Sequence, residues 1–138
     1  MKNLPIGIQS LSELRRKNGI YVDKTQHIHQ LTTRGKFYFL SRPRRFGKSL
    51  LISTLKELFQ GNKKLFEGLW IEDKWDWSTT NPVIHISFDT ISYTEMSLTE
   101  GLRIRLNEIA TDYKIALLAT DLKGQFRELI RKLAENYG

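Results

Sequence analysis

The chain has 138 residues, of which 40% are apolar and 27% charged, which is ordinary for one globular domain with a core. It contains no cysteine, which excludes a disulfide framework and a cysteine-based zinc site. No apolar run reaches the roughly 18 residues of a membrane helix, and the N-terminus lacks the apolar core of a signal peptide. We therefore expect a cytoplasmic protein without a membrane partner.

The net charge of +7 is spread unevenly along the sequence. Residues 1–48 contain eleven Lys and Arg against two acids, whereas residues 49–138 contain eleven against thirteen, so the balances are +9 and −2. A basic segment of this kind predicts an anionic partner, either nucleotide phosphates or a nucleic acid. A basic, solvated face that only aids solubility is the alternative.

Residues 1–36 are predicted to form a helical lead-in. The Ser-x-x-Glu spacing of Ser10 and Glu13 is that of a capping box and predicts a short helix that ends at Asn18-Gly19. A second helix is expected behind Asp23 or Thr25 and should end at Gly35. Tyr21 and Asp23 are candidates for the base or ribose side of a nucleotide, although a buried tyrosine and a capping aspartate are favoured.

Residues 37–60 are predicted to form a strand, a tight loop and a helix. Phe37-Tyr38-Phe39-Leu40 is a short apolar run, and residues 49–60 place Leu51, Leu55, Leu58 and Phe59 at helical spacing. The loop between them is basic and ends in Gly47-Lys48-Ser49. Strand, loop and helix in this order are the context that a P-loop of the form G-x-x-x-x-G-K-[ST] requires.

Each residue type in this loop suits a phosphate. Gly47 has no Cβ and lets the backbone wrap closely around the β-phosphate, at the positive end of the helix dipole. Lys48 is expected to reach the β- and γ-phosphates and to be the catalytic cation, and the Ser49 hydroxyl is expected to bind Mg²⁺. The predicted nucleotide-binding set is completed by Arg44, Arg45, Phe46 and Leu50. The alternative is a plain strand–turn–helix with a solvated lysine.

One position departs from the generic motif. Arg42 stands where the first glycine is expected, and Pro43 fixes φ directly behind it, which predicts a loop stiffer than a glycine-rich one. Arg44 and Arg45 could then touch phosphate, meet an acidic surface of a partner, or face water.

The run Ser-Arg-Pro-Arg-Arg-Phe-Gly-Lys-Ser-Leu, residues 41–50, resembles the hallmark of the AAA-ATPase-like proteins of bacteria and archaea. Tyr-Val-Asp-Lys-Thr at 21–25, Leu-Phe-Glu-Gly-Leu-Trp-Ile at 65–71 and Asn-Pro-Val-Ile-His-Ile-Ser-Phe at 81–88 resemble the same family in the same order. The resemblance implies an ATP-binding P-loop domain whose full chain often continues into a PD-(D/E)XK-type nuclease-like domain. In such proteins the Walker B segment follows the matched region, so the chain is expected to be the front part of the ATPase domain.

Residues 61–138 are predicted to contain a second strand and helices. Val83 to Phe88 alternates in the manner of a strand, and Asp89 behind it is a weak candidate for a Mg²⁺-binding acid. Trp75 and Trp77 could stack bases, although packing at the edge of the core is favoured. A second capping box at Ser97 and a start near Asp121 predict two final helices.

These observations together predict an α/β fold, a three-layer P-loop NTPase sandwich around a parallel sheet that is incomplete in this chain. The predicted function is binding of ATP with Mg²⁺, with hydrolysis expected only of the complete domain. Two alternatives stay open: a basic nucleic-acid-binding module that uses Arg15, Arg16, Lys17, Arg44 and Arg45, and a regulatory interaction module with a non-catalytic P-loop. Nucleic acid is also a candidate partner of the full-length protein.

Overall fold

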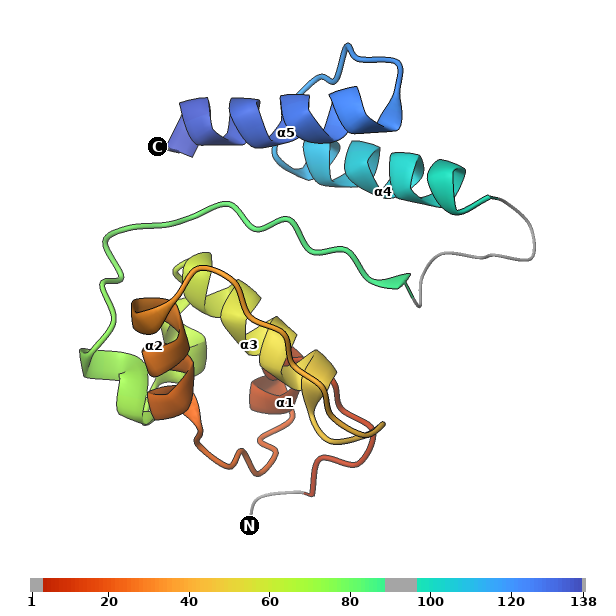
Figure 1. Cartoon of the computed structure of the whole chain (residues 1–138). Coiled ribbons are helices and arrows are strands. Elements are labelled where there is room, and N and C mark those ends of the chain that lie inside the picture. The colour runs from red at the N-terminus through yellow and green to blue at the C-terminus, as the bar shows by residue number, and fades with distance from the viewer. Residues whose placement is uncertain (1–3, 89–96, 138) are drawn as a thin grey trace. The chain divides into compact units, whose positions relative to one another are not determined.

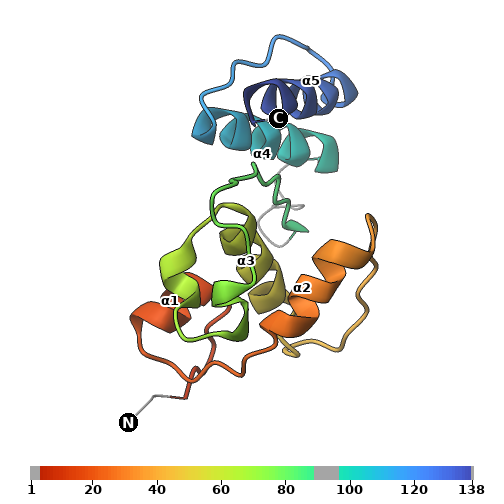
Figure 2. The same cartoon turned by 90° about the vertical axis from the view of Figure 1, so that its left-hand side faces the viewer.

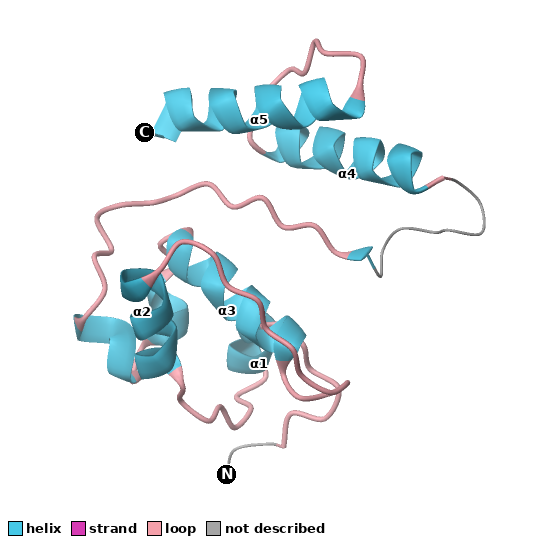
Figure 3. Ribbon diagram, in the orientation of Figure 1, coloured by secondary structure: helices cyan, strands magenta, loops and turns pink. Residues whose placement is uncertain are grey.

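The computed structural model describes residues 4–88 and 97–137, which belong to two compact units, residues 1–83 and 84–138 (Figure 1). Over the described residues the regular structure of both units is helical and contains no strand (Figure 3). Each unit has its own buried apolar cluster and is considered by itself.

The first unit packs short helices around a small core. Its elements are α1 (Leu11–Arg16), α2 (Thr25–Arg34), α3 (Lys48–Phe59) and the 3₁₀ helices η1 (Lys63–Phe66) and η2 (Trp70–Asp73). α1 lies against α3 in both views (Figure 1, Figure 2), and α2 contacts η2. The core of this unit consists of Leu11, Ile28, Leu58, Phe66 and Ile71, each at most 3% exposed.

The predicted helix start at Ser10 is confirmed, because the Ser10 hydroxyl accepts the backbone N–H of Glu13 at 3.3 Å; the Glu13 carboxylate pairs with Lys17 instead of completing a capping box. The N–H of Leu11, the first residue of α1, donates to the Ser53 hydroxyl on α3 at 3.0 Å. The first turn of α1 is therefore satisfied partly by its own cap and partly by the helix that follows the basic loop.

The second unit is a helix pair, α4 (Leu98–Asp112) and α5 (Leu122–Tyr137). Leu106, Ile109, Leu129 and Leu133 are buried between the helices. Both predicted starts are confirmed: the Ser97 hydroxyl accepts the N–H of Glu100 at 3.2 Å, and the Asp121 carboxylate accepts the N–H of Gly124 at 2.9 Å.

The segment that joins α4 to α5 runs back along the pair, so that both helices point in the same direction (Figure 1). Glu128 on α5 fixes this return segment by accepting the N–H groups of Leu118 and Ala119, each at 2.9 Å. Lys132, one turn further along α5, donates to the Ala116 carbonyl at 2.6 Å. The Glu128 carboxylate and the Lys132 ammonium thus satisfy backbone N–H and C=O groups of the return segment, which has no regular backbone hydrogen bonds of its own.

The predicted α/β fold with a parallel sheet is wrong for the described residues. Phe37 to Leu40 is irregular, and the side chains of Phe37 and Phe39 are each 94% exposed. Residues 83–87 form no strand either, and Ile84 and Ile86 instead pack against the core of the helix pair. A β-strand is stable only when a neighbouring strand satisfies its backbone groups. Neither segment is paired with a strand among the described residues, so an apolar run at 37–40 and an alternating pattern at 83–88 did not by themselves produce a sheet.

Candidate functional site

The basic loop, residues 41–47, ends in a backbone conformation that suits glycine. Gly47 is the N-cap of α3 with φ +78° and ψ +17°, in the left-handed region that L-residues rarely adopt. No side chain caps the helix there, and the Leu51 N–H donates to the Gly47 carbonyl at 2.9 Å. α3 therefore presents its first N–H groups, with the positive end of its dipole, to whatever lies at the loop. The prediction of a helix behind Gly-Lys-Ser is confirmed within one residue at each end.

Two hydrogen bonds close the loop on itself. The Lys48 ammonium donates to the Arg42 carbonyl at 2.7 Å, and the Arg42 guanidinium donates to the Phe46 carbonyl at 3.2 Å. Arg42, the residue that replaces the expected glycine, thus takes part in loop closure through both its backbone and its side chain. Lys48 uses one of its three N–H donors in this bond, which leaves two that can reach an anion.

A pocket of about 510 Å³ lies at this helix start. One wall is Arg45 with residues 47–50, and the other is residues 5–9 of the N-terminal segment. Arg45 and Lys48 are the charged residues of the lining, which contains no carboxylate. A pocket of this size with two cations, a helix N-terminus and no acid is suited to a polyanion.

A second pocket, also of about 510 Å³, shares Pro5, Ile8, Gly47 and Leu50 with the first. Its lining is mainly apolar and comes from α1, α2, α3, the segments between them and the segment before α1. Polar or charged groups around that apolar surface come from Tyr21, Lys24, His27, Arg42 and Thr54. The two pockets therefore form one continuous site with a basic end and an apolar end.

The structure brings together most of the residues predicted for this site. Arg45 and the run 47–50, which includes Lys48 and Ser49, line the basic pocket, whereas Phe46 lines the apolar one. Arg44 is exposed and lines neither pocket. The wall formed by residues 5–9 was missed, because its only local signal is a Pro-x-Gly sequence that resembles an ordinary turn.

Asp23 has a structural role. Its carboxylate accepts the N–H and hydroxyl of Thr25 at 2.8 and 2.6 Å, and the N–H of Trp70 at 2.6 Å. Burial raises the pKa of Asp23, but the hydrogen bonds from Thr25 and Trp70 outweigh it and leave the pKa below its ordinary value. Asp23 thereby joins the start of α2 to η2, but it is not the N-cap: that position is Lys24, and no side chain makes a cap hydrogen bond there.

Tyr21, in contrast, has the position expected of a buried packing residue and also lies at the candidate site. It is half-buried against the core of the first unit and hydrogen-bonded to Thr54, and burial raises the pKa of its phenol. It also lines the apolar pocket. The tyrosine is therefore both a packing residue and part of the pocket wall.

The tryptophans belong to the edge of the core. Trp75 packs edge-on against Phe59 with ring centroids 5.4 Å apart, and Trp77 packs on Phe66 at 5.3 Å. The Trp77 indole N–H donates to the Glu72 carbonyl at 2.7 Å. The favoured prediction, packing at the edge of the core, is confirmed for both residues.

A protein metal site is not apparent in the described ranges 4–88 and 97–137, where no three His, Cys, Asp or Glu side chains are grouped to hold an ion. Ser49 is exposed at the basic pocket, so its hydroxyl can reach an ion there. Asp89, the other candidate for Mg²⁺, lies outside the described residues. Of the helices in the described ranges, none is both long and apolar enough to cross a membrane.

Comparison with known proteins places the chain in a family. The family model described as "Predicted AAA-ATPase" matches residues 5–138. The "Uncharacterized protein in vnfD 5'region" of Azotobacter chroococcum mcd 1 is 46% identical over 95% of this chain, which spans 26% of that relative's length. No solved structure matches the chain. Since the family match covers nearly all of the sequence, the chain belongs to the predicted AAA-ATPase family.

Proposed function

We propose that this chain binds ATP, with the phosphates in the basic pocket and the base in the apolar pocket. The observation that carries the proposal is the position of Lys48 and Gly47 at the start of α3, in a pocket that contains two cations and no acid. The family name, Predicted AAA-ATPase, points in the same direction. The basic loop keeps these features although it does not follow a strand.

At the phosphate end, the first N–H groups of α3 and the Lys48 ammonium would bind the β- and γ-phosphates. Lys48 can do so by exchanging its bond to the Arg42 carbonyl, at 2.7 Å, for a stronger charge-assisted one. Arg45 would add a second cation from the pocket wall. Arg44 faces solvent and would approach a phosphate only after the loop rearranges.

At the base end, the planar ring of the adenine would lie in the apolar pocket. It would enter beside the residues that both pockets share, which are Pro5, Ile8, Gly47 and Leu50. Burial of an aromatic ring against such a surface is favourable by the hydrophobic effect. Tyr21 and His27 in the same lining offer hydrogen-bonding groups for the base or the ribose.

The Ser49 hydroxyl would supply one oxygen ligand to Mg²⁺ held on the phosphates. The described pocket provides no carboxylate, so protein ligands alone do not complete a magnesium site, and the other ligands would be phosphate oxygens and water. Lys48 would stabilise charge at the γ-phosphate during hydrolysis. Turnover itself is proposed for the complete protein, because this chain spans 26% of its relative.

Displacement of a fluorescent ATP analogue tests the proposal. Unlabelled ATP should displace the analogue at lower concentration than either tripolyphosphate or adenosine, because each of those ligands fills only one of the two pockets. Displacement by tripolyphosphate as efficient as that by ATP would remove the base pocket from the proposal. If unlabelled ATP did not displace the analogue at all, nucleotide binding itself would be refuted.

A nucleic-acid-binding module is the second candidate function, and two of its five basic residues are already engaged. The Arg15 guanidinium donates to the Glu67 carbonyl, and the Lys17 ammonium is paired with Glu13 at 2.7 Å. Phosphate contacts would have to compete with these bonds. DNA affinity that falls steeply with salt and ignores ATP would favour this function over nucleotide binding.

A further inference from the structure

The outer face of α5 is basic and partly apolar. Phe126 and Ile130, one turn apart, are 40% and 46% exposed, and they line a shallow hollow of about 440 Å³ with Lys123, Arg127 and Arg131. Arg131 is paired with Glu135, whereas the charged groups of Lys123 and Arg127 have no partner among the described residues. Exposed apolar side chains inside a ring of cations suit a partner with acids around an apolar centre.

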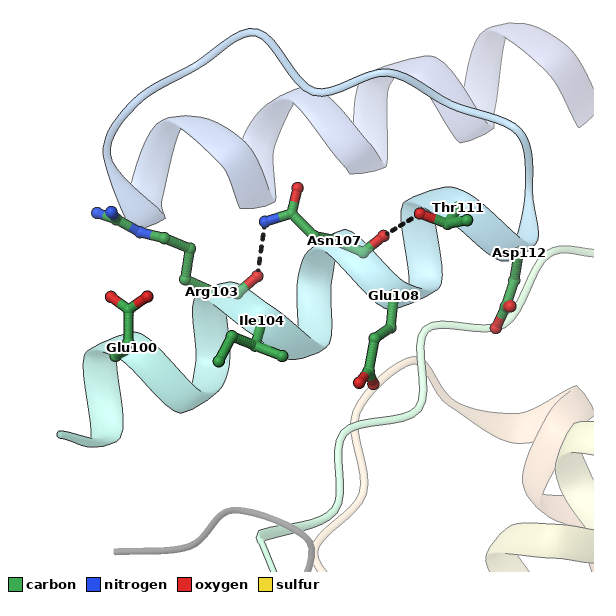
Figure 4. Close-up of a pocket in the computed structure, with 7 residues that line it drawn as sticks. All are labelled: Glu100, Arg103, Ile104, Asn107, Glu108, Thr111 and Asp112. Carbon is green, nitrogen blue, oxygen red and sulfur yellow. Dashed lines mark hydrogen bonds between the residues drawn. The ribbon is translucent and has the colours of Figure 1, made fainter. Parts of the chain in front are cut away.

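The outer face of α4 has the opposite character. Ile104, 42% exposed, stands in a hollow of about 470 Å³ whose lining includes Glu100, Glu108 and Asp112 and one cation, Arg103. Figure 4 shows Ile104 and Glu108 on the side of α4 that faces away from α5. Arg105 pairs with Glu108 at 2.9 Å, but the carboxylates of Glu100 and Asp112 have no partner among the described residues.

From this match we infer that the two faces are complementary halves of one self-association interface: the α5 face of one copy docks on the α4 face of a second copy. Ile104 would meet Phe126 and Ile130, and the free acids of α4 would meet the free cations of α5. The helices have nearly equal lengths, 15 and 16 residues, so their exposed faces can align over several turns.

Charge favours a second copy of this unit as the partner. Residues 84–138 contain seven Lys and Arg against eight Asp and Glu, a balance of −1, so two such units repel each other only weakly. A nucleic acid or an anionic membrane would match the α5 face and be repelled by the α4 face, whereas a second copy uses both. Because the two faces differ, the contact is heterologous, and each dimer keeps one free face of each kind.

Sedimentation of the full chain from about 1 μM to about 1 mM measures the association, since a single-helix contact belongs to the weak, transient class. We expect the average mass to rise with concentration and the rise to diminish at high salt, where charges are screened. A chain that stays monomeric over this whole range overturns the proposal.

Charge reversal then identifies the faces. The α4-face variant is Glu108→Lys with Asp112→Lys, and the α5-face variant is Lys123→Glu with Arg127→Glu. Asp112→Lys places a cation in the last turn of α4 and Lys123→Glu places an acid in the first turn of α5, and the helix dipole favours both. Glu108→Lys removes the ion pair with Arg105, so circular dichroism must show that both variants are folded before their association is compared. Each variant alone should associate at least about tenfold more weakly than the wild type, because like charges then face each other.

The mixture of the two variants is the decisive sample. The intact α5 face of the first variant matches the intact α4 face of the second, and their two reversed faces match as well, so the equimolar mixture should recover the concentration-dependent association of the wild type. A chain that carries all four reversals should associate like the wild type. The control is Lys63→Glu with Lys64→Glu, at exposed positions in the first unit. Unchanged association of the single variants, or a mixture as weak as its components, overturns the proposal.

Discussion

Replacement of Asp23 by alanine should destabilise the first unit more than its exposed position suggests. The carboxylate accepts three hydrogen bonds, two from Thr25 and one from Trp70, at 2.6 to 2.8 Å. Thr25 is fully buried, so its hydroxyl and N–H cannot easily find water after the carboxylate is removed. Trp70 is 38% exposed, and water can partly replace its lost acceptor.

The expected cost follows from these contacts. A hydrogen bond to a charged group contributes about 1.5 to 3 kcal/mol, and an unsatisfied buried donor costs about as much. Discounting the Trp70 bond for water, we expect Asp23→Ala to lower the free energy of unfolding by roughly 2 to 3 kcal/mol. Asp23→Asn keeps one acceptor oxygen but turns the other into a donor, so its cost should be smaller, roughly 1 to 2 kcal/mol.

Urea unfolding followed by tryptophan fluorescence measures this loss, because all three tryptophans lie between residues 70 and 77, in the first unit. Asp73→Ala is the matched control, since that carboxylate is 74% exposed and is paired with Lys74 on the surface. It should change stability by less than about 0.5 kcal/mol. If Asp23→Ala destabilises the unit no more than Asp73→Ala does, the account of Asp23 as the link between α2 and η2 is wrong.

Four further predictions concern local stability. The hydrogen bond from Lys132, with those from the return segment, lowers the pKa of Glu128 from 4.5 to about 2. The ionised Glu128 therefore stabilises the fold above pH 4.5, and this stabilisation is lost as the pH falls from about 4.5 to about 2. The difference in free energy of unfolding between the wild type and Glu128→Gln, measured by circular dichroism, should shrink over that interval. Gly47→Ala should cost roughly 1 kcal/mol in tryptophan-monitored unfolding, because φ is +78° and no other group lies within 4 Å of the new Cβ. Ser97→Ala should cost about 1 kcal/mol by circular dichroism through loss of the α4 cap. Leu129→Ala, at a fully buried position, should cost roughly 2 to 5 kcal/mol by the same method, and a loss below 1 kcal/mol would contradict the described core.

Features set by neighbouring residues could be predicted from the sequence. The serine caps at Ser10 and Ser97 and the start of α5 at Asp121 depend on contacts three residues apart, and the structure contains each of them. The helix behind Gly47 is likewise local. Strands are different, because residues 37–40 and 83–88 need partner strands that neither segment specifies. That dependence on distant partners explains why the predicted sheet was wrong while the helices were right.

The candidate site also combines local features that could be predicted with long-range features that could not. The motif predicts which side chains gather at the start of α3, because Gly47, Lys48 and Ser49 are adjacent in sequence. The opposite wall, residues 5–9, comes from a segment about forty positions earlier and has no motif of its own. Neither the bond from Lys48 to the Arg42 carbonyl nor the apolar pocket beside it could be predicted, since both depend on how the loop folds over α2 and α3.

Titration calorimetry of Lys48→Ala with ATP and Mg²⁺ tests the central claim most directly. The wild type should bind one ATP per chain, and Lys48→Ala should bind at least about tenfold more weakly, because a charge-assisted bond to phosphate is lost. Lys64→Ala, which removes an exposed lysine from η1, should bind like the wild type. If Lys48→Ala and the wild type have equal affinity for ATP, the start of α3 is not the phosphate site.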